Sequence, residues 1–129
     1  MPRVVQREIE AFGEDDVTVR TVRALPWLRV IDTPPIPDTV SRYKLDPGES
    51  AVLAWALAHP DTAVILDDGP ARRCASELGI PVRGTVNLVL SAKRAGMIPL
   101  VQSVLDDLLL AGLYVSPRVI AEALALAGE

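Results

Sequence analysis

Two adjacent carboxylates, Asp67 and Asp68, are the residues of this chain whose position most suggests chemistry. They follow the β-branched run at residues 63–66 and precede Gly69 and Pro70, where a helix is expected to begin. Acids at the C-terminal end of a buried strand, where the strand gives way to a helix, lie where open α/β sheets bind ligands. Their like charges need a compensating cation, arginine or helix N-terminus. Mg²⁺ is the natural cation, because it binds through few carboxylates and keeps several waters.

Length and composition set the class of protein. The 129 residues are enough for one domain with a single core, and half of them are apolar, which predicts a folded chain. The net charge of −4 argues against a nucleic-acid binder that works by bulk positive charge. Cys74 is the single cysteine, so no disulfide within the chain is expected. With no membrane-span or leader pattern recognised, we expect a cytoplasmic protein.

The order of elements predicts an α/β fold with a small parallel sheet flanked by helices. The chain has a charged, proline-rich part at residues 1–46 and a more apolar, helical part at residues 47–129. Apolar periodicity, prolines and glycines predict helices at residues 2–12, 47–59, 70–78, 85–95, 99–111 and 117–127. Short strands are predicted at residues 27–31, 62–67 and 80–82, a loop at 33–38, and either a helix or an extended piece at 15–25.

A longer pattern around the two acids carries a resemblance to a known family. It reads Asp67-Asp68-x-x-Ala71-Arg72-x-x-Ala75-x-x-Leu78-Gly79-Ile80-x-Val82-x-Gly84-Thr85, followed by Leu88, Ala92-Lys93, Gly96 and Ile98. The upstream pieces Gly48-Glu49-x-Ala51-x-x-x-Ala54 and Pro2-x-Val4-Val5-x-x-Glu8-Ile9 extend it. The whole resembles a prokaryotic subfamily of PIN-like domains, described as nucleic-acid-binding and related to the toxins of VapBC-type toxin–antitoxin pairs.

The resemblance implies a ribonuclease that uses Mg²⁺ or Mn²⁺ held by a small set of acids. Carried over by position, the catalytic acids are Glu8, Glu49, Asp67 and Asp68, of which Glu49, Asp67 and Asp68 hold the metal. The same resemblance makes Arg72, Thr85 and Lys93 candidates for contact with RNA. It also implies an antitoxin partner. The helices expected at residues 99–111 and 117–127 are rich in apolar side chains. A sheet that lacks the N-terminal strand described below would cover them poorly, so we also expect a homodimer.

The resemblance also implies a strand, carrying a first catalytic aspartate, ahead of the region that begins at Pro2. No residues of the given sequence match that strand, so we expect an N-terminally truncated PIN-like domain of residues 1–129 with weak or no ribonuclease activity. A form extended upstream through such a strand is expected to regain it. The alternative is a catalytically inactive PIN-like remnant that binds a partner protein or dimerises.

Each candidate residue also has a purely structural interpretation. Asp67 and Asp68 could cap the following helix, and Glu49 could complement a helix dipole in its first turn. Arg72 could pair with the neighbouring acids. Thr85 could cap a helix, and Lys93 could suit the C-terminal end of one.

Overall fold

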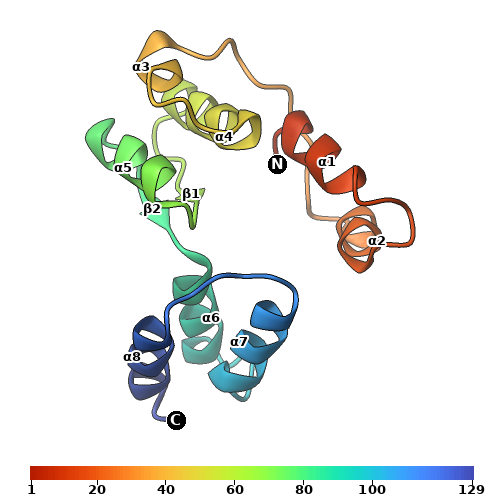
Figure 1. Ribbon diagram of the computed structural model, residues 1–129, viewed down its shortest axis with the longest axis vertical. Helices are drawn as coiled ribbons and strands as arrows, with labels where there is room; N and C mark the ends of the chain where they lie inside the picture. Colours follow the sequence, from red (N-terminus) through yellow and green to blue (C-terminus); the bar gives the residue numbers. More distant parts are fainter. The chain divides into compact units, whose positions relative to one another are not determined.

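The computed structural model describes all 129 residues and divides into two compact units, Met1–Val82 and Arg83–Glu129 (Figure 1). The first unit contains α1 (Arg3–Glu10), α2 (Val17–Ala24), α3 (Asp38–Ser41), α4 (Pro47–Ala58), β1 (Val64–Ile65) and α5 (Gly69–Glu77). The boundary falls within β2 (Val82–Arg83), and the second unit holds α6 (Thr85–Arg94), α7 (Val101–Leu110) and α8 (Pro117–Ala127). None of these helices has the length and apolar character that a membrane span requires.

Helix α4 is the centre of the first unit. Pro47 occupies its first turn, where a missing N–H costs nothing, and Asp46 and Glu49 form a capping box at its start. Small and apolar residues then face in several directions, and Leu53 is fully buried among side chains from β1 and α5. Helices α1 and α3 and strand β1 all pack against α4. A helix covered on so many sides holds its N-terminus in a fixed place, which matters for the acids described below.

The segment β1–α5–β2 forms the small parallel sheet that the sequence predicts, so the α/β class is confirmed. The Val64 N–H donates to the Pro81 carbonyl at 2.8 Å. Parallel strands need a crossover, which α5 supplies. The Asp68 side chain accepts the Ala71 N–H at 3.0 Å and so caps α5, whose far end is closed by Gly79 with a φ of +69°.

Two strand predictions need correction. Residues 27–31 form no strand, and only an isolated parallel bridge joins Pro2 to Ile31. The pairing stops there because the chain turns into α1 at Arg3 and offers no further extended residue. The strand expected at 62–67 is two residues long, and only one of its faces is buried: Val64 is covered, whereas Ile65 is 54% exposed. The ambiguous stretch at 15–25 contains α2, which Asp16 caps through the N–H groups of Thr18 and Val19.

The second unit is a three-helix assembly with its own apolar core (Figure 1). Val101 and Leu105 of α7 are fully buried and pack with side chains of α6 and α8. Glu129 joins α8 to α7, because its two carboxylate oxygens accept the N–H groups of Val101 at 2.8 Å and Gln102 at 2.9 Å. Lys93 of α6 lies 3.0 Å from the same carboxylate. One acid therefore ties all three helices together.

Replacing Glu129 with glutamine should lower the melting temperature of the second unit by a few degrees. The N–H groups of Gln102 and Val101, and then Lys93, hold the pKa of Glu129 below its usual value. A carboxylate whose pKa is lowered by folding stabilises the fold above the unfolded-state pKa and loses that effect as the pH falls through the folded-state pKa. Thermal unfolding should therefore show a gap between Glu129→Gln and the parent that closes in acid. Glu122→Gln is the control, since its exposed pair with Arg118 contributes little.

Candidate active site

The acids expected to act together gather around the start of α4. Glu8 from α1, Asp46 and Glu49 from the start of α4, and apolar side chains of β1 line one cavity of about 240 Å³. Gly48 forms part of the same wall. Three elements that are far apart in the sequence thus contribute to a single concave, acidic surface. Such a combination of a pocket and convergent charged groups is the usual character of a ligand site.

Glu8 is held in this cavity by the backbone of α4. The Gly48 N–H donates to Glu8 Oε1 at 2.9 Å, across forty positions of sequence. Gly48 is buried and has no Cβ, so the carboxylate approaches the first turn of the helix closely. A carboxylate at a helix N-terminus is also stabilised by the helix dipole, by about 0.3–1 kcal/mol. Glu8 therefore has a structural role in joining α1 to α4, whatever else it does.

The surroundings of Glu49 in this cavity change its pKa. Partial burial raises the pKa of Glu49 above its usual value; the Asp46 N–H, which donates to Oε2 at 3.3 Å, opposes this rise. Repulsion by Asp68, then Asp46 and Glu8, raises the pKa further. All three neighbouring carboxylates lie close enough to act on Glu49. A cation bound among them would relieve this repulsion.

Asp67 and Asp68 lie between β1 and α5, as the sequence predicts. Asp68 caps α5 and also acts electrostatically on Glu49, so the helix-capping and metal-binding interpretations of this residue are compatible. Asp67 is exposed beside it. The end of β1 thus lies next to the start of α4.

The donor set suits a cation that takes few protein ligands. No group of three or more His, Cys, Asp or Glu side chains lies close enough to share one metal ion. Glu49 and Asp68 remain as an interacting pair of carboxylates. Mg²⁺ is commonly bound through one or two carboxylates, with waters and substrate phosphate completing its octahedral shell. The residues therefore fit Mg²⁺ or Mn²⁺ and do not form an all-protein cage.

The three residues expected to contact RNA lie in different surroundings. Arg72 is half-buried and donates from Nη1 to the Leu66 carbonyl at 2.9 Å, so it braces the end of β1. Thr85 is the first residue of α6, and Gly84 occupies the capping position predicted for it. Lys93 contacts Glu129 and donates to the Pro99 carbonyl. Arg72 is the one of these three in the same unit as the acids.

Sequence reasoning missed Asp46 as a site residue. Asp46 lines the cavity, where its carboxylate repels that of Glu49 while its N–H donates to Glu49 Oε2. The signal was available, because an acid three residues before Glu49, with Pro47 between them, is a capping-box pattern. A capping acid that also faces other acids can only be recognised once α1 and β1 are placed beside it.

The structure is thus an α/β fold with a cluster of acids beside the end of its small sheet. A family model for the PIN domain matches residues 1–129, and the chain therefore belongs to the PIN domain family. The match spans both compact units. Searches of curated proteins and of solved structures found no match.

Replacing Gly48 with alanine should weaken metal binding while leaving stability nearly unchanged. The new Cβ would lie 3.0 Å from Cδ and 3.1 Å from Oε1 of Glu8, and closer still to Oε2, so the flexible carboxylate must swing away. Alanine favours a helix over glycine by up to about 1 kcal/mol, which offsets the lost hydrogen bond. Calorimetry should show several-fold weaker Mn²⁺ binding. Gly69→Ala is the matched control, because its Cβ would meet nothing nearer than 3.9 Å; equal affinities for the two variants would show that the negative charge of Glu8 does not contribute to Mn²⁺ affinity.

Proposed function

We propose that this protein is an Mg²⁺- or Mn²⁺-dependent ribonuclease. Membership of the PIN domain family supports nuclease chemistry. The observation that carries the proposal is the acidic cavity: Glu8 of α1 and Asp46 and Glu49 at the start of α4 line one hollow, and the charge of Asp68 at the end of β1 acts on Glu49. A cation bound there would relieve the repulsion among these carboxylates.

Each residue has a definite part in this proposal. Glu49 and Asp68 would hold the metal, with Asp67 beside them, and Glu8 would orient a ligand on the opposite wall of the cavity. The metal, when bound, lowers the pKa of a water and neutralises charge on the scissile phosphate. Arg72 fixes the strand end that carries Asp67 and Asp68 through its bond to the Leu66 carbonyl. The acidic cavity repels RNA by itself, so the substrate enters only with a cation present.

A cleavage assay tests the proposal. The protein should cut 5′-labelled single-stranded RNA in the presence of Mn²⁺, slowly because the first catalytic aspartate that the family resemblance implies is not matched, and EDTA should stop the reaction. If RNA stays intact at high protein concentration, the nuclease proposal fails. We also propose that the protein acts as a toxin, as the family resemblance implies: induced expression in bacterial cells should then arrest growth, and expression of the variant Glu49→Gln should not.

The second candidate function is a binding or dimerisation module without catalysis. Exposed apolar side chains of the second unit favour it, because Leu110 is 87% exposed and Leu126 is 67% exposed. Other leucines of these helices pack inside the second unit and are not available for a dimer interface; Leu105 is one of them. An antitoxin or a second copy of the chain would cover the exposed ones. Light scattering that shows a monomer at high concentration would exclude the homodimer.

A further inference from the structure

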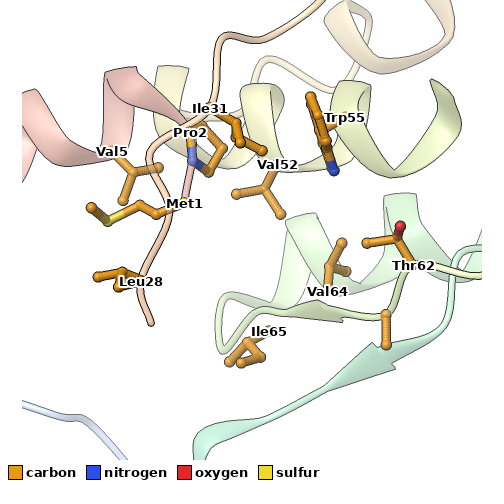
Figure 2. A pocket seen from close by; sticks show the side chains of 11 residues that line it. Met1, Pro2, Val5, Leu28, Ile31, Val52, Trp55, Thr62, Val64 and Ile65 are labelled. Carbon is orange, nitrogen blue, oxygen red and sulfur yellow. The ribbon is translucent and has the colours of Figure 1, made fainter. Parts of the chain in front are cut away.

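An apolar hollow of about 410 Å³ adjoins the acidic cavity, and both are lined by Val5, Val52 and Ile65 (Figure 2). No Asp, Glu, Lys or Arg side chain lines the hollow, and the charged side chains that line the cavity are all acids. Neither lining therefore has a cationic side chain to meet the phosphate backbone of an RNA. A side chain that attracts RNA to the proposed metal site has to come from another element beside these acids.

Arg73 of α5 supplies such a cation. A Cβ at Gly69 would lie 3.9 Å from Nη1 of Arg73, so the guanidinium reaches back along the helix to its first residue. Gly69 directly follows Asp68, whose charge acts on Glu49 in the cavity. The guanidinium therefore lies at the junction of β1 and α5, where acids of the proposed metal site are also found.

The side chain of Arg73 has no partner within the protein. It takes part in no ion pair and no hydrogen bond, and it is exposed to solvent. Its neighbour Arg72 differs, because Nη1 of Arg72 is already engaged with the Leu66 carbonyl at 2.9 Å. All five N–H donors of the Arg73 guanidinium are therefore available to a ligand that arrives from solvent.

The position of Arg73 also opposes the electrostatics of its own helix. A helix N-terminus carries a partial positive charge, which favours acids in the first turn and disfavours cations. Helix α5 has no acid in its first turn, whereas Arg72 and Arg73 lie in its N-terminal half and Glu77 is its last residue. Asp68, at the capping position, supplies negative charge there, but a metal ion held by Asp68 and Glu49 would neutralise it. A phosphate bound beside Arg73 would then balance the remaining positive charge.

We propose that Arg73 binds the RNA phosphate next to the one at the metal and so holds the strand across the end of β1. This inference rests on the proposed nuclease function, because it assigns a contact to the same substrate. The planar guanidinium donates two parallel N–H bonds to a phosphate, which fixes its orientation as well as its distance. A lysine at the same place would keep the charge but would act only as a point charge.

The salt dependence of RNA binding tests this inference. Fluorescence anisotropy measures the affinity of the full chain for a fluorescein-labelled single-stranded RNA at constant Mg²⁺ and rising KCl. Each phosphate contact on a single strand contributes about −0.7 to the slope of log K against log salt concentration, so Arg73→Gln should make the slope shallower by about 0.7. Arg73→Lys should keep the slope but bind several-fold more weakly than the parent. Arg20→Gln, which removes an exposed charge from α2, is the matched control and should keep both slope and affinity.

Binding and cleavage are read separately, because gel electrophoresis of each sample shows whether the RNA is intact. RNA that is bound with the expected change of slope but stays intact would refute the nuclease proposal and support the role of Arg73. An unchanged slope in Arg73→Gln, an equal change in Arg20→Gln, or a parent protein that does not bind RNA would overturn that role. The melting temperature of Arg73→Gln should not fall below that of the parent; a fall of several degrees would make Arg73 a structural residue and would also overturn the inference.

Discussion

Addition of Mn²⁺ should raise the melting temperature of the protein, and loss of Glu49 or Asp68 should abolish the rise. A ligand that binds only the folded state at a hundredfold excess over its Kd stabilises by about 2.7 kcal/mol, which corresponds to several degrees for a chain of this size. The ion would bind where burial and the charges of Asp68, Asp46 and Glu8 now raise the pKa of Glu49. Differential scanning calorimetry with and without Mn²⁺ measures the shift.

The change in melting temperature caused by Glu49→Gln in the absence of metal is an internal control for this prediction. Because folding raises the pKa of Glu49, its stabilising contribution is present at low pH and is lost as the pH rises through the folded-state pKa. Ionised Glu49 therefore destabilises the metal-free fold at neutral pH. Glu49→Gln should raise the melting temperature without metal while removing the response to Mn²⁺. Asp15→Asn, at an exposed position before α2, should behave as the parent does; an Mn²⁺ response that persists in Glu49→Gln would remove Glu49 from the metal site.

Cleavage of single-stranded RNA should fall at least about a hundredfold in Asp68→Asn and in Glu49→Gln, equivalent to roughly 2.7 kcal/mol in the reaction barrier. Each substitution keeps the shape of the side chain but removes a negative charge from the proposed metal site. Asp68→Asn also keeps an oxygen that can accept the Ala71 N–H, so α5 remains capped. Initial rates at saturating Mn²⁺ separate this loss from a weaker affinity for the ion.

The control for cleavage is again Asp15→Asn, which should retain the parent's rate. Comparable rates in all variants, or cleavage that EDTA leaves unchanged, would point to a contaminating nuclease or to another site. Activity that disappears from Asp68→Asn together with its folded signal would report unfolding, and circular dichroism distinguishes that outcome from a loss of chemistry.

The sequence predicted the elements whose boundaries depend on local chemistry. Pro47 with its flanking acids marks the start of α4, Asp68 and Pro70 mark the start of α5, and Gly79 marks its end. Backbone sterics and capping decide these positions within a few residues of the signal. The neighbouring carboxylates of Asp67 and Asp68 could likewise be placed at the end of a strand.

Features that depend on distant partners could not be predicted in the same way. Residues 27–31 are apolar enough for a strand, but a strand needs a continuous neighbour, and the chain supplies only Pro2. The bond between Glu8 and the Gly48 N–H joins two helices that no local rule brings together. Lys93 looked suitable for phosphate, yet it lies against Glu129, thirty-six positions further along the chain.

The most direct test of the proposed metal site is the position of a bound Mn²⁺ ion, measured by paramagnetic broadening of amide signals. At substoichiometric Mn²⁺, the signals of Glu8, Gly48, Glu49 and Asp68 should broaden first, and Asp68→Asn should abolish this selective effect. Selective broadening centred on other acids, such as Asp106 and Asp107 of α7, or uniform broadening across the chain, would contradict a metal site between α4 and the end of β1.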